Sequence, residues 1–228
     1  MDRPVTTLFM LESLDGKIST GAGDNLDIDK DFPKIQGVKE GLHHYYELER
    51  KTDWFSLNTG RVMAKIGVND KKEYHYKVDV IFVIIDNKPH LNENGVDYLC
   101  HWVEKLILVT TNKEHPAFNV KYDNLDILLY EELDLNKLLE DLRSKYNAER
   151  LTIQSGGTLN GLFVREKLID YVNIVIAPIL IGGKDVATLV DGESIKDEEE
   201  LNKLLPLELI ECNKLEDSYI ELKYKVIK

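Results

Sequence analysis

LTIQSGGTLNGLFVREKLIDYVNIVIAPILIGGKDVATLVDG, residues 151–192, begins with a short apolar run that is typical of a buried strand. The run breaks at Ser155-Gly156-Gly157, and Thr158 can cap the helix that follows, whose apolar residues fall on one side. A second apolar run, residues 171–181, ends in another pair of glycines. This order of elements predicts α/β structure with a nucleotide-binding crevice, because a pair of glycines follows each strand and a helix lies between the strands.

The segment from Ser155 to Leu159 is the first candidate site. Paired glycines are ordinary turn residues, but here they lie between a strand and a helix, and this place favours a binding site. The amide groups and the positive dipole end of a helix N-terminus can hold a phosphate. The segment matches neither the dinucleotide pattern G-x-G-x-x-G nor the P-loop. We therefore predict phosphate binding by Ser155, Gly156, Gly157, Thr158 and Leu159 without an ordinary Rossmann fold.

The amino-acid composition argues against some kinds of binding partner. The chain has 228 residues, 43% of them hydrophobic, and a formal net charge of −12, which argues against nucleic acid or an anionic membrane surface. Cys100 and Cys212 fit no metal-binding spacing and are expected to be reduced thiols of a cytoplasmic protein. His43, His44 and Glu47 lie on one predicted helix, but adjacent histidines point to different faces, so we expect no metal site.

Two further turns carry candidate residues. The first follows a predicted strand at residues 5–11 and contains Asp15 and Lys17. In open α/β sheets, ligands bind at the carboxyl ends of strands, where this turn lies. The loop after it, residues 21–31, is either a mobile flap or a plain solvated loop. The second turn, Asn58-Thr59-Gly60-Arg61, follows a predicted strand at residues 53–57, and the Arg61 guanidinium can grip phosphate oxygens in two places.

The rest of the chain predicts a single α/β domain over residues 1–228. Its sheet is largely parallel, with helices on both faces and an antiparallel hairpin at the C-terminal end. Further strands are expected at residues 78–85, 105–111 and 125–130, helices at 38–51, 96–103 and 133–146, and the hairpin at 207–215 and 219–227. No apolar run is long enough to span a membrane.

Two stretches resemble the reductase domain of riboflavin biosynthesis. RPVTTLFMLESLDGKIS, residues 3–19, is similar to the strand and turn that open that domain, and residues 155–193 are similar to its long C-terminal motif. The resemblance implies a dihydrofolate-reductase-like fold, an NADPH cofactor and a homodimer, as in the stand-alone reductases of archaeal and fungal type. The chain departs from the family in three places. The middle turn is not Gly-x-Gly-Thr, an Asp-Asp-Pro segment is not recognisable between residues 67 and 77, and Gln154 precedes Ser155 where the family has glutamate.

The resemblance also implies roles for these residues. The substrate would be a ribosylaminopyrimidine 5′-phosphate, a small molecule whose ribose is reduced to a ribityl chain by hydride transfer. Thr59, Gly60, Arg61 and Val62, together with the segment from Ser155 to Leu159, would hold the dinucleotide. Lys17 would bind the substrate phosphate, and Asp15 would position a hydroxyl or help to deliver a proton. Alternatively, either residue has only a structural role in the turn. The alternatives are a related reductase of a pterin or another carbonyl compound, and a relative that binds a nucleotide without turning it over.

Overall fold

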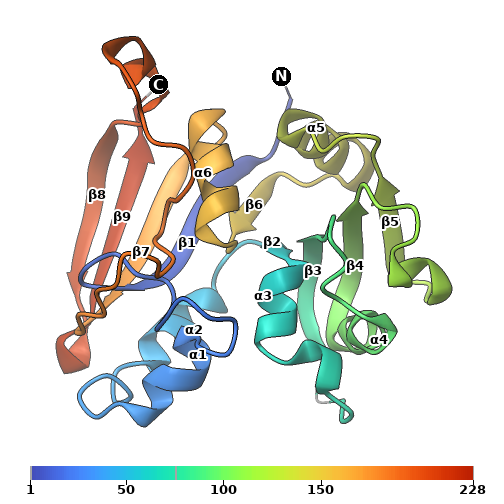
Figure 1. Cartoon of the computed structure of the whole chain (residues 1–228), viewed down its shortest axis with the longest axis horizontal. Coiled ribbons are helices and arrows are strands. Elements are labelled where there is room, and N and C mark those ends of the chain that lie inside the picture. The colour runs from blue at the N-terminus through green and yellow to red at the C-terminus, as the bar shows by residue number, and fades with distance from the viewer. Residues whose placement is uncertain (1, 75, 228) are drawn as a thin grey trace. The chain divides into compact units, whose positions relative to one another are not determined.

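The computed structural model describes residues 2–74 and 76–227 (Figure 1). The chain folds as two compact units. The first unit comprises Met1–Pro4 and Asp53–Ser155, and the second comprises Val5–Thr52 and Gly156–Lys228. The expectation of one domain over residues 1–228 stays a prediction.

The first unit contains a parallel sheet. Its strands, in spatial order, are β5 (Leu125–Leu129), β4 (Val103–Thr110), β3 (Val78–Ile85), β2 (Phe55–Thr59) and β6 (Arg150–Ile153). Every neighbouring pair is parallel, so the carboxyl ends of these strands meet at one edge of the sheet. That edge therefore places the residues after β2, β3 and β6 near one another.

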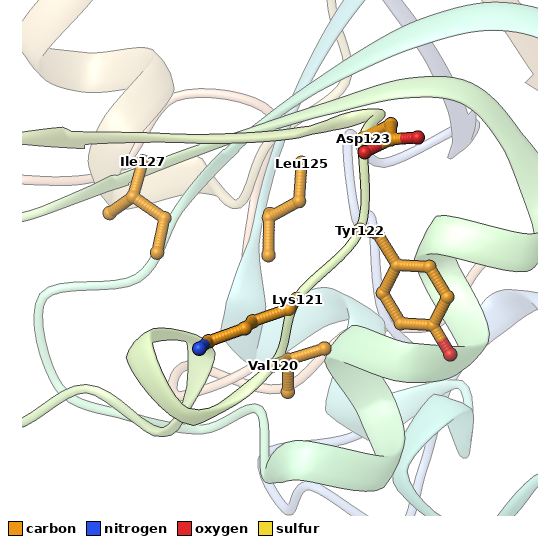
Figure 2. Close-up of a pocket in the computed structure, with 6 residues that line it drawn as sticks. All are labelled: Val120, Lys121, Tyr122, Asp123, Leu125 and Ile127. Carbon is orange, nitrogen blue, oxygen red and sulfur yellow. The ribbon is translucent and has the colours of Figure 1, made fainter.

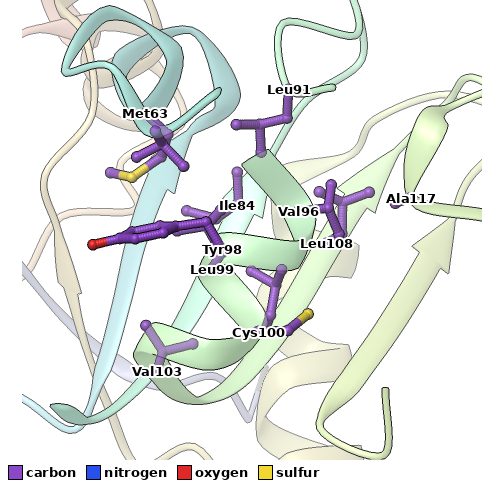
Figure 3. Packing of buried hydrophobic residues seen from close by; sticks show 12 residues of the cluster. Met63, Ile84, Leu91, Val96, Tyr98, Leu99, Cys100, Val103, Leu108 and Ala117 are labelled. Carbon is purple, nitrogen blue, oxygen red and sulfur yellow. The ribbon is translucent and has the colours of Figure 1, made fainter. Parts of the chain in front are cut away.

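Helices α3 (Gly60–Lys65) and α4 (Glu93–Trp102) cover one face of this sheet. Figure 3 shows the packing, in which Val96 and Leu99 of α4 and Met63 of α3 lie with Ile84 of β3 and Leu108 of β4. The leucines of α5 (Leu135–Tyr146) at positions 135, 138, 139 and 142 are all buried. The helix expected over residues 133–146 is therefore confirmed, and it begins two residues later than predicted.

The second unit contains a mixed sheet. Its strands, in spatial order, are β1 (Val5–Ser13), β7 (Tyr171–Ala177), β9 (Ile220–Val226) and β8 (Leu207–Lys214). Strands β1 and β7 are parallel, whereas β9 runs antiparallel to both β7 and β8. The predicted C-terminal hairpin is confirmed, and so is a mostly parallel α/β fold.

Short helices cover one face of β1 and β7. They are α1 (Ile28–Asp31), the 3-10 helix η1 (Phe32–Lys34) and α2 (His43–Glu49). Phe32 is fully buried, and the ring of Tyr45 stacks on that of Phe9 with 5.2 Å between centroids. Helix α6 (Gly157–Arg165) begins directly after the junction of the two units. The remaining short elements are the 3-10 helices η2 (Val68–Asp70), η3 (Pro116–Asn119), η4 (Glu198–Lys203) and η5 (Glu216–Ser218).

Several predicted boundaries were wrong, among them the following three. Residues 28–31 form a helix and not part of a loop, because the Asp27 side chain caps the helix and Ile28 is buried in the core. The helix expected over residues 38–51 is shorter, since α2 spans only His43–Glu49. The strand expected over residues 171–181 ends at Ala177, where Pro178 lacks the amide hydrogen that a ladder needs. Across the described ranges, no helix has the length and apolar character that crossing a membrane requires.

Candidate active site

The turn after β1 is organised by the carboxylate of Asp15. This carboxylate accepts a hydrogen bond from the Ser13 hydroxyl at 2.6 Å and from the amides of Ile181 at 3.0 Å and Gly182 at 2.6 Å. The Ser13 hydrogen bond, followed by that of the Ile181 amide, lowers the pKa of Asp15 to about 2. Asp15 therefore ties the second glycine pair of the sequence to the turn.

Lys17 lies in the same turn and is half-buried. Its ammonium donates to the carbonyl oxygen of Val186 at 3.2 Å, and its amide donates to the Ser13 hydroxyl at 2.9 Å. An ammonium has three N–H donors, so the contact with Val186 leaves capacity for an anion. The structure thus brings Asp15 and Lys17 together in one turn, at the carboxyl end of β1.

Helix α6 begins one residue after Gly156, which is its N-cap. The prediction that Thr158 caps this helix was wrong, because the backbone is already helical from Gly157 and Thr158 lies exposed in the first turn. Leu159 follows it and is half-buried. At Gly156 a Cβ atom would meet no heavy atom of the described residues within 4 Å. This α-carbon is therefore open to close approach by a ligand.

Gly157 has a different environment. A Cβ there would lie 2.3 Å from the carbonyl oxygen of Thr188 and 2.3 Å from a carboxylate oxygen of Asp191. The missing side chain therefore makes room for residues 188–191 of the same unit. Ligand binding at Gly156 therefore stays a prediction, whereas packing within the protein accounts for the glycine at position 157.

In the first unit, the turn after β2 forms the start of α3. Thr59 is the N-cap, and its hydroxyl accepts a hydrogen bond from the amide of Val62 at 3.3 Å. Gly60 is buried, and Arg61 is exposed in the first turn. Ser155, which ends this unit, is buried. Thr59, Arg61 and Val62 thus lie at the edge of the sheet where the parallel strands end.

Asp86 is a residue at this edge that the sequence reasoning missed. It follows β3, is 1% exposed, and accepts hydrogen bonds from Nε2 of His115 at 3.0 Å and from the amides of His90 at 3.1 Å and Leu91 at 2.9 Å. Burial by itself would raise the pKa of Asp86, but these hydrogen bonds outweigh burial and hold the pKa below its usual value. A Cβ at Gly60 would lie 2.2 Å from the carboxyl carbon of Asp86. The buried carboxylate therefore leaves no room for a side chain at position 60.

An open pocket lies elsewhere in the first unit. Figure 2 shows its lining residues, which precede β5 or belong to it: Val120, Lys121, Tyr122, Asp123, Leu125 and Ile127. None of the predicted site residues lines this pocket. Among the residues that the structure describes, no group of three His, Cys, Asp or Glu side chains is arranged to hold a metal ion.

Residues 4–220 match the family of the RibD C-terminal domain. The chain is 30% identical to the 2,5-diamino-6-ribosylamino-4(3H)-pyrimidinone 5′-phosphate reductase of Methanothermobacter thermautotrophicus, over 98% of this chain and 99% of the relative. It is 35% identical to the protein of the same name from Aquifex aeolicus, over 92% of this chain and 91% of the relative.

Solved structures share the fold at lower identity. RibD of Acinetobacter baumannii superposes with a TM-score of 0.70 and 17% identity over 99% of this chain, which spans 59% of the length of that protein. The riboflavin biosynthesis reductase Rib7 of Saccharomyces cerevisiae superposes with a TM-score of 0.62 and 16% identity, over 99% of this chain and 90% of the yeast chain.

Proposed function

The chain belongs to the RibD C-terminal domain family, and we therefore propose that it is an NADPH-dependent reductase of riboflavin biosynthesis. Its substrate would be a ribosylaminopyrimidine 5′-phosphate, whose ribose it reduces to a ribityl chain. One observation carries this proposal: the two relatives that are 30% and 35% identical over nearly their whole length bear the same name, a reductase of such a phosphate.

Each unit offers groups that suit part of a dinucleotide. In the second unit, the backbone is open to close approach at Gly156, and the first turn of α6 supplies backbone amides at a positive helix end. In the first unit, the exposed guanidinium of Arg61 offers charge-assisted hydrogen bonds to a 2′-phosphate, which would favour NADPH over NADH. When bound, the reduced nicotinamide supplies the hydride that the sugar carbon accepts.

Lys17 and Asp15 have different proposed roles. The Lys17 ammonium would bind the 5′-phosphate of the substrate, since it is half-buried, cationic and held in place by the Val186 carbonyl. A carboxylate with a pKa of about 2 is ionised at neutral pH. We therefore assign Asp15 the role of orienting the turn and residues 181–182, and not that of delivering a proton.

Two further expectations stay predictions. A homodimer is favoured by the edge strand β8, on which the apolar side chains of Leu209 and Ile210 are each 51% exposed. A cytoplasmic location rests on the reduced thiols expected at positions 100 and 212, of which Cys100 is buried and Cys212 exposed.

The function is tested by two measurements on purified protein. One follows NADPH oxidation in the presence of the pyrimidine phosphate, and the other titrates NADPH binding alone. Oxidation supports the reductase, binding without oxidation supports a nucleotide-binding relative, and the absence of both refutes the proposal. A pterin tested in place of the pyrimidine distinguishes the related reductase.

A further inference from the structure

Residues 186–191, which we call the strap, hydrogen-bond along the turn after β1. The amide of Ile18 donates to the carbonyl of Ala187 at 3.0 Å, and the amide of Leu189 donates to the carbonyl of Gly16 at 3.2 Å. The ammonium of Lys17 donates to the Val186 carbonyl. The strap therefore binds both the backbone and the side chain of the turn that carries Lys17.

The other end of the strap lies on α6. The amide of Asp191 donates to the carbonyl of Gly157 at 2.9 Å, and Nδ2 of the fully buried Asn160 donates to the carbonyl of Leu189 at 2.8 Å. A Cβ at Gly161 would lie 2.0 Å from the Asp191 carbonyl oxygen. Only glycine fits at so short a distance, so Gly157 and Gly161 together make the surface on which the strap lies.

The carboxylate of Asp191 fixes the bend between these two ends. Its Oδ1 accepts the Thr188 hydroxyl at 2.6 Å, and its Oδ2 accepts the Thr188 amide at 3.2 Å. Thr188 in turn forms an antiparallel bridge with Lys17. The carboxylate also lies at the first residue of α6, where the helix dipole favours a negative charge. Asp191 thus links the two ends, because its carboxylate holds Thr188 and its backbone amide donates to Gly157 of α6.

We infer that Asp191 is a positioning residue, which holds Lys17 at a fixed place relative to the first turn of α6. This inference rests on the proposed function, because it gives Lys17 a substrate phosphate to bind. The Thr188 amide and hydroxyl both donate to the carboxylate. An amide side chain would replace one acceptor oxygen with an NH₂ group and would remove the charge that strengthens both hydrogen bonds. Asp191→Asn should therefore loosen the strap while keeping the size of the side chain.

The test compares Asp191→Asn with Asp185→Asn. The control removes the same charge from an exposed aspartate that lies just before the strap. The first readout is the hydrogen exchange of the Ile18 and Leu189 amides, which needs no activity. We expect exchange at least tenfold faster in Asp191→Asn and unchanged in the control. The second readout is KM for the pyrimidine phosphate, which should rise about fivefold in Asp191→Asn alone.

A double variant shows whether Asp191 acts through Lys17. In a Lys17→Ala background, Asp191→Asn should change KM less than twofold, because the group that it positions is already gone. A full fivefold effect in that background, or exchange no faster than in the control, would overturn the inference. If Asp191→Asn does not fold, Thr188→Val replaces it, because it removes the hydroxyl hydrogen bonds to Asp191 and Val190 and keeps the Thr188 amide. The same two outcomes then decide.

Failure of the proposed function would be visible separately. In that case the unmodified protein would not turn over the pyrimidine phosphate, whereas the exchange experiment would still report on the strap. Faster exchange confined to Asp191→Asn would then support the attachment by Asp191, and equal exchange in both variants would refute it.

Discussion

Glu12 should make the stability of the protein depend on pH. Its side chain is half-buried on β1, beside Ile176 of β7 in the strand register, and its Oε2 has no hydrogen-bond partner within the described ranges. Burial raises the pKa of Glu12 from 4.5 to about 7. The folded state therefore favours the neutral acid, whereas the unfolded chain ionises near pH 4.5. Stability is lost as the pH rises from about 4.5 to about 7, and the loss is constant above that range.

The magnitude follows from the two pKa values. A shift from 4.5 to about 7 corresponds to roughly 3.4 kcal/mol at high pH, of which roughly 2 kcal/mol develops between about pH 5.5 and 8.5. The side chain is still partly exposed, so solvent screening reduces this to about 1 kcal/mol. Glu12→Gln removes the titration at nearly constant volume. The free energy of unfolding of Glu12→Gln, relative to that of the unmodified protein, should therefore be about 1 kcal/mol higher at about pH 8.5 than at about pH 5.5.

Urea unfolding of both proteins at the two pH values measures this difference. Glu208→Gln is the matched control, because it makes the same change at an exposed position of β8. A Glu12→Gln effect that is equal at both pH values would refute the reasoning. Such a result would mean that the Glu12 carboxyl is as well solvated in the folded protein as in the unfolded chain.

Three further predictions concern the proposed site. Arg61→Ala should lower the preference for NADPH over NADH by about ten- to a hundredfold in binding titrations, and equal affinity of the unmodified protein for both would contradict the role. Gly156→Val should weaken NADPH binding at least tenfold with an unchanged melting temperature, whereas Gly157→Val should lower the melting temperature because its side chain would collide with the strap. Normal NADPH binding by folded Gly156→Val would place the cofactor elsewhere. Lys17→Ala should raise KM for the phosphorylated substrate and leave NADPH affinity nearly unchanged, and steady-state kinetics with neither KM nor kcat altered would remove Lys17 from the site.

Local sequence patterns predicted the strands and the longer helices of this fold. The apolar run of β3 and the leucine stripe of α5 are signals within one element, and both elements formed where they were expected. Helix α1 was missed because it has four residues and depends on burial of Ile28 against distant residues. The start of α6 was misplaced because glycine and threonine are both acceptable N-caps, and only the backbone conformation distinguishes Gly156 from Thr158.

The parts of the site that escaped prediction depend on contacts between distant positions. Asp86 meets His115 across 29 positions, and Asn160 meets Leu189 across 29 positions. No local pattern encodes such a pair, so neither Asp86 nor Asn160 could be singled out from the sequence. The turn with Asp15 and Lys17 was found because a strand that ends in Asp-Gly is a signal within a few residues.

The reductase assignment is tested most directly by one measurement. Purified protein is mixed with NADPH and 2,5-diamino-6-ribosylamino-4(3H)-pyrimidinone 5′-phosphate, and the loss of NADPH is compared with the gain of ribityl product by mass spectrometry. We predict that one molecule of NADPH is consumed for each molecule of product formed. NADPH that binds but is not oxidised in the presence of this substrate would contradict the assignment.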